Sequence, residues 1–242
     1  MTAALLEPFP TDWSRALCVV AHPDDLEYGA AVAVANWVRS GRSVSYLLVT
    51  RGEAGIDSLH PDDCGRVREA EERASAACVG VGAVDFLSEH HDGVVEYGLP
   101  LRRDLAAALR LGRPDIVVGI HFGLAWGGGA YNQADHRHVG LALLDAVRDA
   151  GNRWIFSELN EFSEPWSGTR LVAMAGSPSP THAQPVTDAD LTAGVDSLRC
   201  HELYLSALGG EFDPESFLTS NAVAAGDQAG VPLAVSFEVF RP

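Results

Sequence analysis

The chain has 242 residues, of which 47% are hydrophobic and 21% charged, so it carries enough apolar side chains for a sizeable folded core. Its formal net charge of −16 argues against nucleic acid or an anionic membrane surface as a partner, because both would repel it. The N-terminal residues lack a basic segment followed by an apolar one, and no apolar run reaches the roughly 18 residues of a membrane span. We therefore expect a cytoplasmic protein without a nucleic-acid or membrane partner.

Cysteine spacing gives no sign of a disulfide framework. Cys18, Cys64, Cys78 and Cys200 form no CxxC pair, and two of them lie within apolar strand-like or helix-like patterns. We expect these thiols to be reduced and most of them to lie in the core.

Strands and helices are predicted to alternate through the first 150 residues. Predicted strands at 16–21, 43–50, 83–87 and 115–120 are each followed by a predicted helix, at 27–40, 64–79, 100–111 and 135–150. The first strand is almost continuously apolar, which is typical of a strand buried on both faces. This alternation predicts βαβ units, an α/β fold and a mostly parallel sheet.

The rest of the chain is predicted with less regular spacing. Residues 1–14 are expected to be a loose lead-in and 177–187 a loop containing prolines. Further strands are predicted at 154–157, 171–175 and 231–240, and a helix at 188–208 that Asp188 or Thr187 caps. The sequence shows no repeat, low-complexity tract or long linker, so we expect a single domain over residues 1–242.

The tetrapeptide His22-Pro23-Asp24-Asp25 directly follows the first predicted strand, where α/β sheets form their ligand crevices. A histidine with two nearby carboxylates is half of a plausible metal site. The same four letters recur at 60–63, but no strand precedes them, and there Pro61 and the acids are suited to begin a helix. Helix capping is also an alternative at 22–25, although it explains only one of the two acids there.

A third metal ligand must come from elsewhere in the chain. His136 is the best candidate, because it opens the helix behind the fourth strand, at the same edge of the sheet. His138 is two positions further on and should point to another face. The alternative is that Asp135 caps this helix and both histidines are solvated.

Five segments taken together resemble the LmbE-like (PIG-L) N-acetylglucosaminyl deacetylase family. They are Ala21 to Asp25 behind its strand, the loop 50–53, the helix that Arg68 to Glu71 head, the pair Asp92-Gly93, and Asp135-His136, in the family's order over 16–145. The helix around His201 resembles a late helix of the family. The resemblance implies a Rossmann-like three-layer αβα sandwich, a divalent metal that is usually zinc, and hydrolysis of an N-acyl group.

Carried over by position, the resemblance implies that His22, Asp25 and His136 bind the metal. Asp24 would be the general base that takes a proton from the attacking water. Tyr131 matches a position whose hydroxyl stabilises an oxyanion, although packing beneath the glycine-rich loop is an equal alternative.

Three further residues, Glu53, Arg68 and Asp92, match positions that line the substrate pocket. Each also has an ordinary structural alternative: a turn residue, a surface ion pair with Glu71 or Glu72, and an Asp-Gly turn. Gln133 departs from the family, where a histidine is common and an aspartate orients it. Glutamine can donate a hydrogen bond to an oxyanion or substrate but cannot exchange a proton, so Asp135 loses its usual catalytic partner.

The sequence therefore predicts a zinc-dependent amide hydrolase that removes an N-acyl group, most commonly acetyl, from a small polar amine such as an amino sugar. Another divalent transition metal would also suit the site. One alternative is an amidase that cuts a mycothiol-type thiol conjugate with the same residues. Another is a weakened small-molecule-binding protein, which Gln133 suggests. The sequence leaves a homo-oligomer open.

Overall fold

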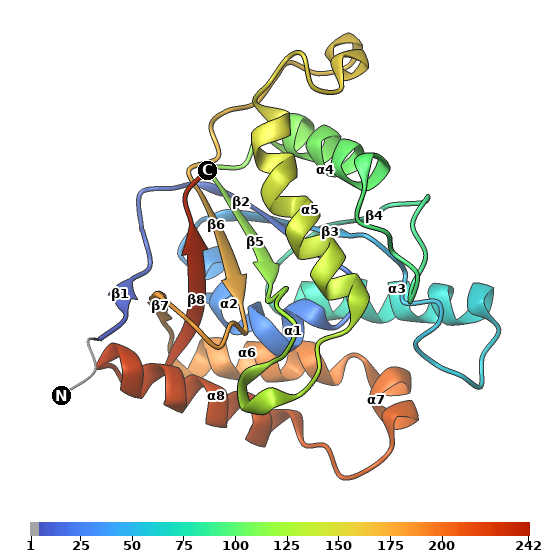
Figure 1. Ribbon diagram of the computed structural model, residues 1–242. Helices are drawn as coiled ribbons and strands as arrows, with labels where there is room; N and C mark the ends of the chain where they lie inside the picture. Colours follow the sequence, from blue (N-terminus) through green and yellow to red (C-terminus); the bar gives the residue numbers. More distant parts are fainter. Residues whose placement is uncertain (1–4) are drawn as a thin grey trace.

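The protein is described over residues 5–242 by a computed structural model, in which an eight-stranded sheet forms the centre (Figure 1). The strand order is β1-β7-β8-β6-β5-β2-β3-β4. All neighbours pair in parallel except β8, which is antiparallel to β6 and β7. The strands are β1 (Glu7–Pro8), β2 (Arg15–Val20), β3 (Ser43–Leu48), β4 (Ala83–Phe86), β5 (Ile116–Ile120), β6 (Leu171–Ala175), β7 (His182–Pro185) and β8 (Ala234–Phe240).

Strand β2 lies in the interior of the sheet, between β3 and β5. Its side chains enter two cores in alternation: Cys18 and Val20 pack on one face of the sheet, and Leu17 and Val19 on the other. A strand covered on both faces has no solvent side to make polar, which explains its apolar sequence. The residue after this strand therefore starts from a rigid, buried position.

Helices cover both faces of the sheet, so the fold has three layers (Figure 1). Helices α4 and α5 pack together over the core that contains Leu17 and Val19. Helices α2 and α3 cover the opposite core, and α6 packs against α2 and α3. The helices are α1 (Asp25–Gly29), α2 (Ala31–Arg39), α3 (Pro61–Cys78), α4 (Leu99–Gly112), α5 (Ala134–Ala150), α6 (Asp188–Arg199), α7 (Glu202–Leu208) and α8 (Pro214–Ala229), with short 3₁₀ turns η1 (Gly127–Gly129) and η2 (Ser157–Glu161).

The expected α/β sandwich with a mostly parallel sheet is confirmed. Each predicted strand and helix of the first 150 residues is present, with boundaries shifted by a few residues. The predicted helix 27–40 is interrupted at Ala30, which separates α1 from α2. Of the two predicted caps, Asp188 and Thr187, the structure has Thr187, which forms a reciprocal capping box with Asp190 at the start of α6.

The second half of the chain corrects several predictions. Residues 154–157 form no strand, and Trp154 is 81% exposed, so this short apolar run meets no neighbouring strand. The predicted helix 188–208 is divided into α6 and α7, because the backbone at His201 leaves the helical conformation and its side chain turns into the interior. Strand β1 lies within 1–14, where no strand was predicted; residues 1–4 of this segment fall outside the described range. Strand β7 lies within 177–187, which was predicted to be a loop. Helix α8 was not predicted.

Among residues 5–242, no helix combines the length and the apolar character that crossing a membrane requires.

Candidate metal centre

The turn after β2 holds its two aspartates in different ways. Both backbone N–H groups of Ala21 and His22 donate to Oδ2 of Asp25, at 3.0 and 2.9 Å, so this carboxylate turns back over the end of the strand. Asp24 adopts a left-handed backbone with φ of 92°, which costs a non-glycine residue about 1–3 kcal/mol. No side-chain hydrogen bond caps helix α1. Helix capping, the alternative reading of this tetrapeptide, is therefore wrong.

Three side chains meet at this turn, as the sequence predicts for a metal site. His136 Nε2 lies 3.0 Å from Asp25 Oδ1, and His22 Nδ1 lies 3.7 Å from Asp25 Oδ2. One donor atom from each of the three residues lies within 4.8 Å of the others. Two imidazoles and a carboxylate are a donor set that suits zinc and leaves a further position open, as catalytic zinc sites do. The residues present therefore fit a divalent transition metal.

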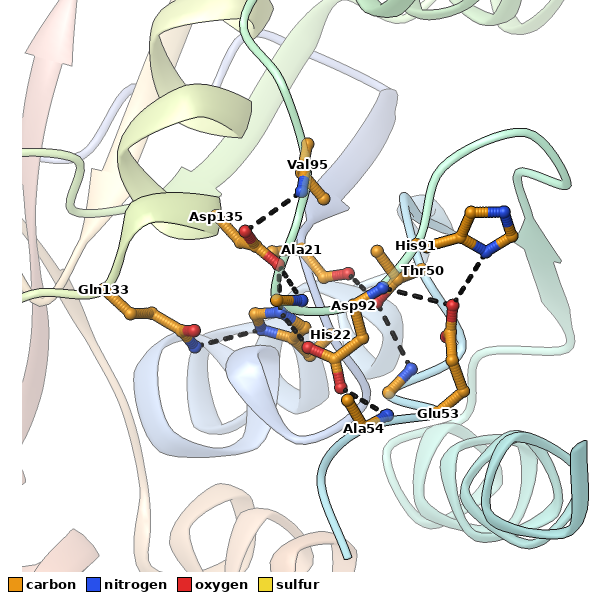
Figure 2. Close-up of polar contacts among 12 residues, drawn as sticks. Ala21, His22, Thr50, Glu53, Ala54, His91, Asp92, Val95, Gln133 and Asp135 are labelled. Atoms are coloured by element: carbon orange, nitrogen blue, oxygen red, sulfur yellow. Dashed lines mark hydrogen bonds and ion pairs between the residues drawn. The ribbon is translucent and has the colours of Figure 1, made fainter. Parts of the chain in front are cut away.

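Outer hydrogen bonds fix which nitrogen of each histidine faces the centre. His22 Nε2–H is shared between Asp92 Oδ1 at 3.1 Å and Asp135 Oδ2 at 3.2 Å (Figure 2). His136 Nδ1–H donates to Asn132 Oδ1 at 2.8 Å. His22 Nδ1 and His136 Nε2 are thereby left to face Asp25, the arrangement that metal-binding histidines usually have. No pattern in the sequence points to the buried Asn132 as a partner of His136.

Gln133 reaches toward the same point between the ligands. Its Nε2 lies 3.4 Å from His22 Nδ1 (Figure 2) and 3.0 Å from His136 Nε2, the two nitrogens that face the centre. Asp135, which lacks the histidine that the family commonly has at 133, has other partners. Besides His22, the backbone N–H groups of Gly93 and Val95 donate to its carboxylate, at 2.7 and 3.2 Å. Asp135 therefore orients a metal-binding candidate instead of a proton carrier.

Asp24 is buried in the wall of the cavity, where Arg68 Nη2 donates to its Oδ1 at 2.9 Å. Burial raises the pKa of Asp24 to about 7; Arg68 lowers it and Asp25 raises it further. Asp25 behaves in the opposite way: burial would raise its pKa, but His136 holds it well below the ordinary value. The two adjacent carboxyls are therefore suited to different tasks, proton exchange for Asp24 and charged coordination for Asp25.

Arg68 is fully buried, so the alternative of a surface ion pair is wrong. Its guanidinium lies 3.8 Å from the ring centre of Tyr204 and also donates to the carbonyl of Pro23 at 2.5 Å. Arg68 thus holds both the turn and Asp24 in place at the cavity wall.

Glu53 and Asp92 join two loops at the edge of the site. Glu53 Oε1 accepts from His91 Nδ1 and from the backbone N–H of Asp92, both at 3.1 Å, while Asp92 Oδ2 accepts from the backbone N–H of Ala54 at 3.0 Å (Figure 2). Asp92 lines the cavity, whereas Glu53 lies behind it. This places Glu53 in a loop-bracing position and leaves Asp92 facing the open space.

Two sequence candidates lie away from the centre. Tyr131 is 72% exposed and its hydroxyl accepts from Arg137 Nη1 at 2.6 Å, outside the cavity, so its position does not support the oxyanion role. In the second tetrapeptide, Pro61 and the two acids begin α3, as the sequence predicts for this copy, but the N-cap is His60 and not an acid.

The cluster opens into a cavity of about 900 Å³. At the polar end its walls carry His22, Asp24, Arg68 and Gln133. The other walls are lined largely by residues that were not predicted as site residues, namely Tyr28, Trp126, Tyr204, Phe217, Leu218, Asn221 and Ala222. The space is large enough for a small organic molecule beside the ligand cluster.

The fold and the cluster together define a class: an α/β protein with a buried His–Asp–His metal-binding candidate at the carboxyl ends of a parallel sheet. Within that class the chain belongs to the PIG-L family of GlcNAc-PI de-N-acetylases, whose model matches residues 17–147. That match contains most of β2, the turn with His22 and Asp25, and the start of α5 with His136.

One curated relative of this chain is a deacetylase. The diacetylchitobiose deacetylase of Thermococcus kodakarensis is 32% identical over 147 residues, which cover 60% of this chain and 53% of that protein. The chain thus spans about half the length of the curated relative that it matches.

Solved structures show the same fold. The N,N'-diacetylchitobiose deacetylase from Pyrococcus horikoshii, complexed with its inhibitor MPG, matches with a TM-score of 0.82 at 24% identity, covering 95% of this chain and 85% of that chain. GalB, the 4-carboxy-2-hydroxymuconate hydratase from Pseudomonas putida, matches with a TM-score of 0.70 at 17% identity, covering 95% and 97%. Because this fold hosts more than one chemistry, the activity must be argued from the site.

Proposed function

We propose that this chain is a zinc-dependent N-deacetylase that removes an acetyl group from a small polar amine, such as an amino sugar or its conjugate. One observation carries the proposal: His22, Asp25 and His136 converge, and the carboxyl of Asp24 faces the same cavity without belonging to the ligand set. Two of the proteins that the chain resembles are diacetylchitobiose deacetylases, which supports an N-acetylated sugar as the substrate class. We propose further that residues 1–242 act as a single domain.

In this proposal His22, Asp25 and His136 would hold the ion. When bound, zinc would polarise the amide carbonyl and lower the pKa of water at the site. Asp24 would take the proton of the attacking water and deliver it to the leaving amine, for which a pKa of about 7 is well matched. Arg68 keeps Asp24 in place through the 2.9 Å contact with its Oδ1.

Three further residues would support the reaction. The amide of Gln133, which points between the two histidines, would donate a hydrogen bond to the developing oxyanion. Asp135 would act by orienting His22, to which it is hydrogen-bonded. Asp92 would accept hydrogen bonds from substrate hydroxyl groups at the cavity wall, because it already faces that space.

A second candidate function rests on Gln133. An amide cannot exchange a proton near neutral pH. If the reaction requires a histidine at position 133, this chain would bind ligands with little turnover. The position of Asp24 opposes this reading, because a buried carboxyl that faces the cavity beside the ligand set can take up a proton and return it. A mycothiol-type conjugate would use the same residues and differ only in the group beyond the amide.

Release of acetate from N-acetylglucosamine and N,N'-diacetylchitobiose by the zinc-loaded protein tests the proposal, with a thiol conjugate assayed beside them. We expect acetate from at least one sugar, and we expect Asp24→Asn to slow its release by about 10²–10⁴-fold while zinc content stays unchanged. Turnover of the thiol conjugate alone would favour the amidase. Binding of the sugars without any hydrolysis would instead favour the weakened binding protein and contradict the proposed activity.

A further inference from the structure

A second group of potential ligands lies inside the protein, between helices. Glu27 belongs to α1, Glu72 to α3, and His201 stands at the break between α6 and α7. Their exposed fractions are 0%, 1% and 0%. One donor atom from each of the three lies within 4.8 Å of the others. Neither the predicted site nor the proposed reaction uses Glu27 or His201.

Several polar atoms of this group have no hydrogen-bond partner among residues 5–242. They are Glu27 Oε2, Glu72 Oε1 and both ring nitrogens of His201. An unsatisfied buried polar group costs about 1–3 kcal/mol, and more when it is charged. Four such atoms in one place call for an explanation, such as an ion or a water that binds among them.

The spacing of these atoms is informative. His201 Nε2 lies 3.6 Å from Glu27 Oε2 and 3.7 Å from Glu72 Oε2, which is too long for hydrogen bonds. Zinc bonds to imidazole and carboxylate are about 2.0–2.2 Å long, so two tetrahedral ligands of one ion lie roughly 3.4 Å apart. The observed separations are therefore close to those of ligands around a shared ion.

Charge leads to the same conclusion. Burial, and after it the charge of Glu27, raises the pKa of Glu72 well above its ordinary value. Two buried carboxylates this close need either a shared proton or a cation. One divalent ion would balance two carboxylates and a neutral imidazole without any proton, and two carboxylates with one histidine suit zinc and its first-row neighbours.

We propose that Glu27, Glu72 and His201 form a second, structural site for a divalent transition-metal ion, occupied as the chain folds. The other oxygen of Glu27 is already fixed, since Ser75 Oγ donates to Oε1 at 2.6 Å and Ser197 Oγ at 3.3 Å. The hydroxyl of Tyr46 is also buried and has no hydrogen-bond partner among the described residues.

This site would also support the turn after β2. Glu72 Oε2 accepts the backbone N–H of Asp24 at 3.2 Å, the residue with the strained left-handed backbone. An ion that fixes Glu72 would fix that hydrogen bond as well. The proposal does not depend on the proposed deacetylase activity, because it concerns metal content and stability alone.

The second site is tested with protein expressed in the presence of zinc. Its zinc content per folded chain is measured before and after dialysis against a chelator. We expect about two ions per chain in the wild type before dialysis, and one resistant ion in the double variant His22→Ala/His136→Ala. His201→Gln should lose that resistant ion and unfold at a lower temperature. His60→Gln, which removes an exposed histidine far from either group, is the matched control and should behave as the wild type.

The double variant keeps the test decisive even where His201→Gln fails to fold. A wild type with one ion per chain, together with a double variant that holds none, would overturn the proposal. That result would mean that a shared proton or a buried water satisfies Glu27, Glu72 and His201. Retention of the resistant ion by folded His201→Gln would equally contradict the assignment of its ligands.

Discussion

The sequence His-Pro-Asp-Asp occurs twice, and the two copies have different structures. At 22–25 the histidine follows a central strand and is 4% exposed, and Asp25 folds back onto the end of that strand. At 60–63 the histidine is 71% exposed at its side chain and caps helix α3 from a loop. The tetrapeptide itself therefore does not make a site; a buried strand in front of it and His136 opposite it do.

We expect the largest difference in turnover between substitutions of the two histidines, His22 and His60. His22→Ala removes a ligand and leaves Asp92 and Asp135 facing an empty space, so we expect zinc-dependent turnover to fall by more than about 100-fold, beyond what loss of an outer partner costs. His60→Ala should leave turnover unchanged. Rates of acetate release at saturating substrate measure both, and similar losses in the two variants would remove the distinction between the copies.

The aspartates in third position should differ almost as strongly. Asp24→Asn retains the shape of the side chain but cannot take a proton, so we expect kcat to fall by about 10²–10⁴-fold with zinc still bound. Asp62→Asn, the matching change in the second copy, should have no effect on kcat. Wild-type kcat from Asp24→Asn would exclude this residue as the base.

A smaller effect should come from the partners behind the histidines. Asp135 accepts from His22 Nε2, whereas His60 has only a weak local contact with the N–H of Asp62. We expect Asp135→Asn to weaken zinc binding by about 10–100-fold. Competition with a chelator of known affinity measures this, and an unchanged affinity would show that His22 is oriented by Asp92 alone.

We expect the smallest effect from the acids of the copy at 60–63, whose loss should change only the free energy of unfolding. Asp62 and Asp63 lie in the first turn of α3, where acids complement the helix dipole by at most about 1 kcal/mol. Asp63→Asn should therefore lower the free energy of unfolding slightly and leave zinc content unchanged, as denaturant titration would show. A loss of bound zinc would mean that the second copy is also a metal ligand.

Much of this fold could be predicted because its signals are local. The strand behind His22 is apolar on both faces, and Thr187 with Asp190 forms a capping box within four residues. Helix α8 gave no such signal, because its alanines lie on several faces and leave no continuous apolar stripe. The break at His201 depends on burial beside Glu27 and Glu72, which no local pattern shows.

The same limit applies to the candidate site. His22, Asp25 and His136 could be proposed from strand context and family resemblance, and they do converge. The partners of Arg68 could not be predicted, since its contact with Asp24 joins residues 44 positions apart. Tyr131 matched a motif but lies outside the cavity, on an exposed loop where its hydroxyl accepts from Arg137 of α5.

The central claim is that the copy at 22–25, completed by His136, holds a metal ion. Anomalous X-ray diffraction at the zinc edge from crystals of the zinc-loaded protein tests it most directly. We expect an anomalous peak about 2.0–2.2 Å from His22 Nδ1, His136 Nε2 and a carboxylate oxygen of Asp25. A well-ordered map without a peak at these three atoms, or with one at His60 instead, would contradict it.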